Sequence, residues 1–327
     1  MSSRLVSSSA APPDYTLLYR RLSSVEEVRG SNYDLLITAV DGSDRTRLLL
    51  DAGTAVRVVC AVLPQYQFSL SEIADLEGQY PAVLPLVMSS GDEADFASEL
   101  LRRFPIGSGF RVCLDLSGFP RTHLCHLVLR LISLGVSEFD AMYIEPEHYV
   151  YEEETVFAEG TVGVRPIRGF EGVDRPNRTE VLLIGTGFDV DVMNEVARQK
   201  PGALKLQLFG LPSLQPEMYQ QNLLRTIVAG DAVEDSVVSD RFFAPAYCPF
   251  ETAQTVQQAL RRAKSLGQNL YLAPLGTKVQ ALGFTLYYLH ECMGQRATMF
   301  GVTSSRLRRA SAVGVGRVWR YELRMLG

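Results

Sequence analysis

Residues 270–284 read LYLAPLGTKVQALGF, which is an apolar run, a short turn and the start of an apolar helix. Pro274 ends the run, and Leu275-Gly276-Thr277-Lys278 forms the turn. A strand that is apolar throughout and passes directly into a helix is typical of a parallel sheet covered on both faces. The turn therefore places a glycine, a hydroxyl and a lysine at the carboxyl end of a buried strand.

The same unit of strand, turn and helix recurs along the second half of the chain. Its apolar runs are expected to be strands at 180–185, 204–209, 239–244, 269–273 and 297–302. Helical patterns between and after them cover residues 189–199, 215–230, 249–267 and 278–294. The runs are not separated by the Asn-Gly or Asp-Gly pairs of antiparallel hairpins. The second half is therefore predicted to form a parallel sheet.

The first half repeats the pattern less regularly. Strands are expected at 33–40, 56–62, 111–116 and 139–144, and helices at 93–104 and 121–135. The segment 150–179, rich in Glu, Gly, Pro and Arg, marks the boundary between the halves. The closing segment RVWRYELRML alternates with period two, as an edge strand does.

We therefore predict an α/β protein of two Rossmann-like lobes, each a parallel sheet flanked by helices, with a C-terminal edge strand. The expected domains are an N-terminal tail and lead-in segment at 1–30, a first lobe at 31–150, a connecting segment at 151–178, and a second lobe with the edge strand at 179–327.

Composition restricts the class of protein. The 327 residues are 46% hydrophobic and 21% charged, with a formal net charge of −5, so a soluble protein is expected and nucleic acid is not expected as a partner. No apolar run approaches the roughly 18 residues of a membrane span. The five cysteines include no CxxC pair, which favours a reducing cytoplasm. The apolar run in the Ser-rich N-terminus is too short for a signal peptide, so a disordered tail is expected there.

Ligands bind open parallel sheets at the carboxyl ends of the strands, where helix N-termini converge. Lys278 opens a helix at such an end, where the helix dipole disfavours a cation. A bound anion such as phosphate would explain it, although a tight turn with a solvated lysine remains the alternative. The candidate ligand-binding residues of the second lobe are Gly185, Thr186, Gly187, Asp189, Gly276, Thr277, Lys278 and Gln280.

Two nucleotide-binding motifs are absent from these turns. A dinucleotide fingerprint would require a glycine at Val190 and an acid at the end of the next strand, LQLFGLPS, which has none. A Walker A loop would read GK[ST] where this chain has GTK, with a glycine at Tyr271. Both departures argue against NAD, S-adenosylmethionine and P-loop sites, and no cofactor is predicted.

Polar residues also follow the strands of the first half. Asp41, Ser43, Arg45, Asp115, Ser117 and Glu145 are secondary candidates. Their carboxylates could hold a metal or serve as acid and base, but no spacing rule links them. Capping and contacts between the lobes are therefore favoured, and no metal site is predicted. The His-Leu-Cys-His run at 123–126 likewise lacks the spacing of a metal site.

The run LAPLGTKVQALGF resembles the strand-turn-helix of CRISPR-associated Rossmann-fold (CARF-like) sensor domains, which carry a similar T-G-G-T-K before an apolar helix. In that family these residues line a pocket for cyclic oligonucleotide second messengers, often at a dimer interface. The resemblance implies ligand contacts for Gly276, Thr277 and Lys278, with Gly185–Gly187 lining the same crevice. Pro274 and Leu275 depart from the hydroxyl and glycine that the family has there.

The whole layout is also similar to an uncharacterised two-lobed bacterial family of defence-type gene neighbourhoods. The shared features include YDLLITAVDGSDR, DLSGFPR, YIEPEHY, RPIRGFEG, LLIGTGFD and GRVWRY. This resemblance covers nearly the whole chain and implies no particular activity.

The leading hypothesis is a cytoplasmic sensor or accessory protein of bacterial anti-phage defence that binds a phosphate-bearing nucleotide at the second lobe. Its partners would be a nucleotide second messenger, a protein partner or, in a homodimer, a second copy of the chain. The alternatives are a nucleotide-processing enzyme that uses Lys278 with the acids of the first lobe, or a non-catalytic scaffold. A binding role is favoured over catalysis.

Overall fold

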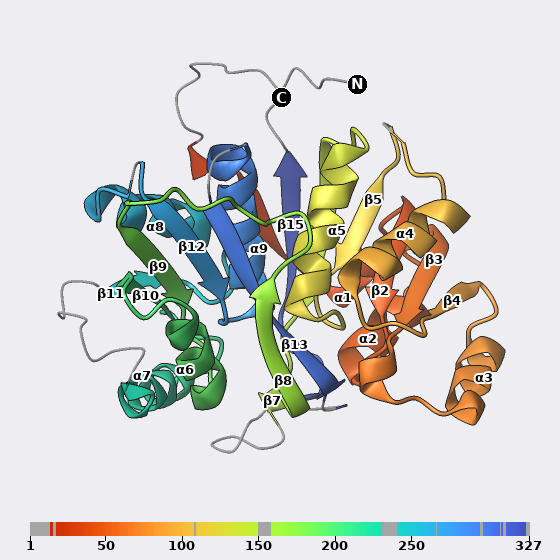
Figure 1. The fold of residues 1–327 in the computed structure, drawn as a ribbon. Helices are drawn as coiled ribbons and strands as arrows, with labels where there is room; N and C mark the ends of the chain where they lie inside the picture. Colours follow the sequence, from red (N-terminus) through yellow and green to blue (C-terminus); the bar gives the residue numbers. More distant parts are fainter. Residues whose placement is uncertain are drawn as a thin grey trace.

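The computed structural model describes residues 14–15, 18–107, 109–149, 158–230, 241–265, 267–294, 297–307, 309 and 312–324. Residues 1–13 of the expected tail, residues 150–157 at the start of the connecting segment, and the start of the strand expected at 239–244 lie outside the described residues. Within them, the predicted two Rossmann-like lobes are confirmed: two sheets, each dominated by parallel strands, with helices against them (Figure 1).

Seven described strands form the sheet of the first lobe. Their order across it is β1 (Tyr19–Ser23), β15 (Val318–Arg324), β6 (Glu138–Ile144), β5 (Val112–Asp115), β2 (Tyr33–Ala39), β3 (Ala55–Val62) and β4 (Val83–Val87). The five strands from β6 to β4 are parallel, whereas β15 runs antiparallel to β6 and to β1. The helices of this lobe are α1 (Val25–Arg29), α2 (Asp44–Asp51), α3 (Leu70–Gln79), α4 (Glu93–Arg103) and α5 (Arg121–Ser133), with a 3₁₀ turn η2 (Pro64–Tyr66).

Six described strands form the sheet of the second lobe. Their order is β11 (Arg241–Ala244), β10 (Leu204–Gly210), β9 (Glu180–Gly185), β12 (Asn269–Pro274), β13 (Ala297–Leu307) and β8 (Ala158–Pro166), with only β8 antiparallel. The helices are α6 (Val190–Gln199), α7 (Met218–Val228), α8 (Pro249–Arg262) and α9 (Lys278–Tyr287), which continues into a π turn η6 (Tyr288–Cys292). A short pair joins β7 (His148–Tyr149) to β14 (Ala312–Val313).

The parallel parts of both sheets follow the same strand order. Numbered along the chain within each lobe, that order is 3-2-1-4-5. The direction of winding therefore reverses between β2 and β5 in the first lobe and between β9 and β12 in the second. Such a reversal leaves a crevice at the carboxyl ends of the two strands, because the helices that follow them cover opposite faces of the sheet. Each lobe thus contributes one crevice of the same kind.

Three apolar clusters hold the layers together. The largest lies between the two sheets and includes residues of α4, α5, α8 and α9. Helices α5 and α9 contact each other there, at the centre of the molecule (Figure 1). A second cluster packs α1, α2 and α3 on the outer face of the first sheet, and a third packs α6 on the outer face of the second. The lobes share one continuous core, which fixes the spacing between their crevices.

The expected C-terminal edge strand is not at an edge and does not extend the second sheet. β15 lies between β6 and β1 in the first sheet, so the chain ends in the lobe in which it begins. Its alternation is explained by burial: Trp319, Tyr321 and Leu323 are buried on one side. Period two reveals that one face is buried, but it does not reveal which sheet buries it.

The described strands β1, β4, β7 and β14 were not predicted, and β4 shows why an edge strand can be missed. β4 contains Pro85, which interrupts the pattern of an inner strand but is tolerated at an edge, and β4 lies at the edge of its sheet. β8, from the connecting segment, pairs with β13 and so extends the second sheet.

Candidate functional site

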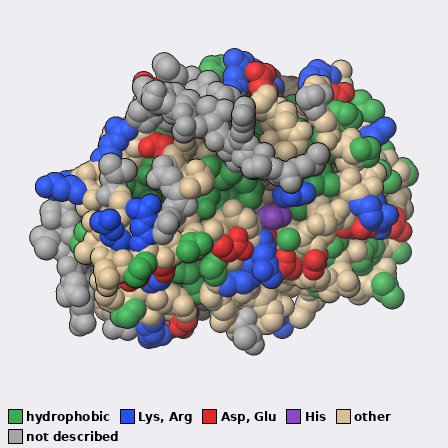
Figure 2. All heavy atoms as spheres, turned by 45° about the horizontal axis from the view of Figure 1, so that its top comes forward, with side chains coloured by type: hydrophobic (Ala, Val, Ile, Leu, Met, Phe, Trp, Pro, Cys, Tyr) green, Lys and Arg blue, Asp and Glu red, His purple; other side chains and the backbone are tan. Residues whose placement is uncertain are grey.

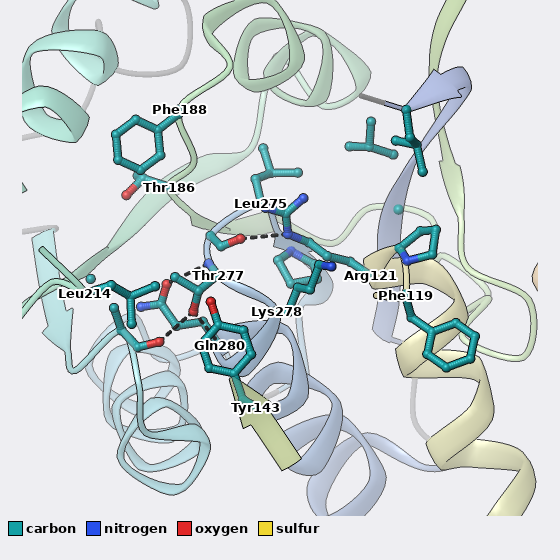
Figure 3. Close-up of a pocket in the computed structure, with 18 of the residues that line it drawn as sticks. Phe119, Arg121, Tyr143, Thr186, Phe188, Leu214, Leu275, Thr277, Lys278 and Gln280 are labelled. Atoms are coloured by element: carbon teal, nitrogen blue, oxygen red, sulfur yellow. Dashed lines mark hydrogen bonds between the residues drawn. The ribbon is translucent and has the colours of Figure 1, made fainter. Parts of the chain in front are cut away.

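A pocket lies between the lobes where their crevices meet (Figure 3). Its wall includes residues that follow each of the four strands at the reversal points: Asp41 and Arg45 after β2, Phe119–Arg121 after β5, Thr186 and Phe188 after β9, and Pro274–Lys278 after β12. Its volume of about 170 Å³ would hold on the order of ten water molecules. The pocket can therefore hold a ligand of many atoms.

Three cations line the pocket, each from the first turn of a helix. Arg45 is the second residue of α2, Arg121 the first of α5 and Lys278 the first of α9. The N-terminus of a helix carries a partial positive charge, which opposes a cation and favours an anion. The N-caps of α2 and α5, Ser43 and Pro120, make no side-chain capping hydrogen bond. Repulsion among these groups would fall if an anion bound between them.

Arg45 has a carboxylate partner. Its Nη2 lies 3.2 Å from Oδ2 of Asp41, and both side chains are buried. The other oxygen of Asp41 accepts hydrogen bonds from the backbone and hydroxyl of Ser43 and from the hydroxyl of Thr46. Burial alone would raise the pKa of Asp41, but Arg45 and Lys278 hold that pKa below its ordinary value. Asp41 is therefore a fixed anion that is paired with Arg45 and acts on Lys278 only from beyond ion-pair distance.

Arg121 and Lys278 bind each other's turns. Nε of Arg121 donates to the carbonyl of Gly276 at 2.7 Å, and Nζ of Lys278 donates to the carbonyl of Ser117. Among the described residues, no carboxylate is within ion-pair distance of either cation. Figure 3 shows the two side chains next to each other in the pocket. A cation buried without a counter-ion costs free energy, which a bound anion would offset.

The pKa of Lys278 is lowered to about 7. Burial is the largest cause, Arg45 and Arg121 act in the same direction, and Asp41 and Asp115 oppose them. Burial also lowers the pKa of Arg121. An anion in the pocket would favour the protonated lysine and raise its pKa.

Tyrosines surround the cations. Tyr66, Tyr143 and Tyr149 line the same part of the pocket. The Tyr66 hydroxyl donates to the carbonyl of Gly118 at 2.8 Å. Burial raises the pKa of Tyr143 and of Tyr149. These phenols remain protonated at neutral pH, and Tyr66 already donates its proton to Gly118. The tyrosines therefore add polar groups without charge to the wall beside the cations.

The opposite part of the pocket is apolar with two amides. Phe188, Leu214 and Met218 supply the apolar surface. Asn222 donates to the carbonyls of Thr186 and Gly187 at 3.1 and 3.3 Å, which holds the turn after β9. Gln280 forms a capping box with Thr277, and its Nε2 atom is buried with no hydrogen-bond partner among the described residues.

The structure brings half of the sequence-predicted candidates to the pocket wall. Those are Thr186, Gly276, Thr277, Lys278, Gln280, Asp41 and Arg45. Gly185 and Gly187 do not line it and have packing reasons to be glycine. A Cβ at Gly187 would lie 2.5 Å from the carbonyl oxygen of Leu275, and one at Gly185 would lie 3.0 Å from the ring of Phe284. Asp189 caps α6 by accepting from the backbone of Val192.

The remaining first-lobe candidates have structural partners. Ser43 binds Asp41, and Asp115 accepts from the hydroxyl of Thr38 and the backbone of Ser117, both at 2.7 Å. Glu145 accepts from Arg317 and from the indole of Trp319, each at 2.7 Å, which joins β6 to β15. Ser117 contributes to the site with its backbone carbonyl, which accepts the hydrogen bond from Lys278, and not with its hydroxyl.

Arg121 is the residue that the sequence reasoning missed. The sequence nevertheless contains a pattern that could have identified it. DLSGFPR places an arginine at the start of a helix that follows a strand, just as LGTK places Lys278. The argument from the helix dipole applies equally to both. The tyrosines carried no local signal, because they come from η2, β6 and β7 and meet only in the folded chain.

Among the described residues, no three His, Cys, Asp or Glu side chains gather as metal ligands. None of the described helices is long and apolar enough to cross a membrane. The described residues on the face in Figure 2 show Lys and Arg interspersed with Asp and Glu. Of the C-terminal arginines, Arg309, Arg317 and Arg320 pair with Glu72, Glu145 and Asp140.

No protein-family model matches the chain, and comparison with curated protein sequences gives no match. Among solved structures, it is similar to a type III CRISPR defence DNA nuclease activated by cyclic oligoadenylate (TM-score 0.38, 10% identity, 81% of this chain and 65% of that one). It is also similar to Haemonchus contortus phosphoethanolamine N-methyltransferase 1 (TM-score 0.25, 7% identity, 77% and 72%). This chain spans less than two thirds of the nuclease chain. At these TM-scores neither likeness bears on function.

Proposed function

We propose that the pocket between the lobes binds a phosphate-bearing nucleotide. The observation that carries the proposal is the meeting of Arg45, Arg121 and Lys278 at three helix N-termini, with Asp41 as the only carboxylate paired to any of them in the described chain. Phosphate is the anion that suits this set, because guanidinium forks, an ammonium and helix N–H groups all donate to its oxygens.

The remainder of the pocket suits a nucleoside. Beyond the cations, the wall passes to the ring of Phe188 and to Leu214 and Met218, with amide groups from Asn222 and Gln280. Small-molecule sites commonly combine such apolar surface with a few fixed polar groups. A free inorganic phosphate would leave this apolar part unused, whereas a base and sugar would cover it.

The role that we propose is sensing rather than catalysis. The acids that could act as acid or base, namely Asp41, Asp115 and Glu145, are each engaged by hydrogen bonds that stabilise the fold. Lys278 and Arg121 join the two lobes across the pocket, so a ligand that binds them contacts both lobes at once. The resemblance of LAPLGTKVQALGF to CARF-like sensor domains supports the same role, and with it a place in bacterial anti-phage defence.

Calorimetric titration with nucleoside monophosphates and cyclic dinucleotides tests the proposal. Arg121→Met and Lys278→Met should each raise the Kd of a bound nucleotide about 10- to 100-fold, because each removes a charge-assisted hydrogen bond. Arg130→Met, at the other end of α5, and Lys264→Met, an exposed lysine, are the matched controls and should leave the Kd unchanged. Absence of binding at millimolar ligand, or equal losses in the controls, would refute the phosphate site.

Binding should also weaken as the pH rises above 7. A bound anion raises the pKa of Lys278 from its free value of about 7, so above pH 7 the free protein must take up a proton to bind. A cyclic dinucleotide is the suitable probe, because a phosphodiester lacks the second phosphate ionisation near pH 6. We expect its Kd to be constant below pH 7 and about 10- to 100-fold higher at pH 9. Lys278→Met should remove this dependence, and an unchanged profile in that variant would assign it to another group.

A further inference from the structure

Gln280, which lines the pocket, has an unpaired hydrogen-bond donor, whereas its amide oxygen already has a partner. Its Oε1 accepts from the backbone N–H of Thr277 at 3.2 Å, while the Thr277 hydroxyl accepts from the backbone of Gln280 at 3.1 Å and donates to the carbonyl of Ala246 at 2.7 Å. This capping box fixes the orientation of the amide, because the oxygen must face the Thr277 N–H. The NH₂ group is therefore turned away from the cap.

That NH₂ group has no partner. Gln280 is 1% exposed, and its Nε2 makes no hydrogen bond to any described residue. A buried donor left unpaired costs about 1–3 kcal/mol, and buried polar groups in native proteins are almost always paired. A ligand atom that accepts from Nε2 would remove this cost.

The amide has access to the pocket through Gly210. A Cβ at Gly210 would lie 3.6 Å from both Nε2 and Oε1 of Gln280 and 3.1 Å from Cβ of Ala246, so the glycine leaves open the space next to the amide. Gly210, Leu214 and Ala246 line the pocket around it, and Figure 3 shows Gln280 between Thr277 and Leu214. The donor thus faces the apolar part of the pocket.

The donor and the cations are at different ends of the site. Lys278 and Gln280 are two residues apart in the first turn of α9, so their side chains leave the helix about 200° apart. Both nevertheless line the same pocket. A nucleotide whose phosphate lies at Lys278 and Arg121 would therefore place its base, not its phosphate, at Gln280.

An amide with a free oxygen and a free NH₂ group reads adenine, because it can accept from the exocyclic amino group and donate to a ring nitrogen at once. Gln280 lacks the free oxygen. Its two N–H groups instead match adjacent acceptors, such as O6 and N7 of guanine or hypoxanthine, or the O4 of uracil. An amino base would place its own donor against them.

We propose that the pocket selects nucleotides whose base carries an oxygen at the 6-position of a purine or the 4-position of a pyrimidine over those that carry an amino group at that position, and that Gln280 is the residue that selects them. The inference rests on the proposed nucleotide site and adds the class of base. Gly210 and the capping box of Thr277 act through Gln280: the first leaves the donor accessible, and the second fixes its direction.

The test compares ligands that differ only at that edge. Calorimetry with inosine and adenosine 5′-monophosphates, and with uridine and cytidine 5′-monophosphates, should give Kd values at least about 10-fold lower for the oxo member of each pair. Gln280→Glu keeps the capping box, because glutamate also serves at this position, but replaces the donor by an acceptor. In that variant all affinities fall together through the added charge, and the ratio within each pair should reverse.

Gly210→Ala is the second variant. This variant retains Gln280 but covers its NH₂ group with a methyl group. The ratio of the two Kd values within each pair should therefore fall toward one, whereas Arg121→Met should still weaken binding. Thermal unfolding of both variants confirms that the fold is retained. Equal affinities within the pairs, or a ratio of affinities that Gln280→Glu leaves unchanged, would overturn the role of Gln280. The phosphate site would still stand in that case if Arg121→Met weakens nucleotide binding. Failure of all four nucleotides and of cyclic dinucleotides to bind would refute both proposals.

Discussion

Replacing Asp41 by asparagine is expected to lower the free energy of unfolding by about 3–5 kcal/mol. Arg45 is 5% exposed, and Asp41 is the only carboxylate that pairs with it among the described residues. Removing the negative charge leaves a buried guanidinium beside Lys278 and Arg121, with no anion between them. Breaking a buried pair is costly for this reason, even where the intact pair contributes little. Urea unfolding followed by circular dichroism measures the change.

Two variants make the Asp41 experiment decisive. Asp44→Asn, three residues away, is the matched control: its pair with Arg47 is exposed, and asparagine can still accept from the backbone of Gly314, so stability should change by less than about 1 kcal/mol. The double variant Asp41→Asn with Arg45→Met should be less destabilised than the sum of the two single variants, because neither charge is then left alone. Additive effects would show that the pair is not coupled.

The pH dependence of this contribution has a definite sign. The pKa of Asp41 is held below its ordinary value of 3.8 in the folded protein. Its stabilisation is therefore complete above pH 3.8, where the unfolded carboxylate is also charged, and is lost as the pH falls through the lower folded value. Asp41→Asn should accordingly flatten the acid side of the stability profile.

Gly118→Ala is expected to destabilise the protein by about 3 kcal/mol or more. A Cβ at this position would lie 1.8 Å from the carbonyl oxygen of Ala39 and 2.8 Å from its carbon. Both are backbone atoms of β2, so no side-chain rotation can relieve the contact. The turn after β5 would have to move away from β2, and with it the Ser117 carbonyl that holds Lys278 and the start of α5 that carries Arg121.

The same substitution at Gly78 is the control, and its expected effect has the opposite sign. Gly78 lies inside α3, and a Cβ there would meet nothing within 4 Å. Gly78→Ala should stabilise the protein by about 0.5–1 kcal/mol, because alanine loses less backbone entropy in a helix. Denaturant unfolding of both variants under one condition gives the comparison. Similar values for the two glycines would contradict the close approach of β2 and the turn after β5.

Much of the fold follows from local sequence pattern. The apolar runs at 33–40, 56–62, 180–185 and 204–209 correspond to β2, β3, β9 and β10 with small shifts of their ends. Such runs are readable because a strand buried on both faces must be apolar throughout. β4 escaped notice because Pro85 breaks the pattern, and an edge strand tolerates what an inner strand does not.

The site was only partly predictable. Lys278 could be singled out from the sequence alone, since a cation at a helix N-terminus conflicts with the dipole of that helix. Its contacts could not, because the Ser117 carbonyl lies 161 residues away and in the other lobe. The same holds for Tyr143 and Tyr149, which are ordinary buried residues of β6 and β7 until the second lobe packs opposite them.

The sequence by itself determined the alternation of strands and helices, the class of fold and the strand ends of the second lobe that line the pocket. These depend on periodicity, turn chemistry and helix dipoles, which act over a few residues. Only the tertiary structure decided that β15 returns to the first sheet, and that the crevices of the two lobes form one pocket with cations from both. Those outcomes depend on which buried faces pack together. The faces come from residues that are distant along the chain, and no local sequence pattern indicates which of them will pair.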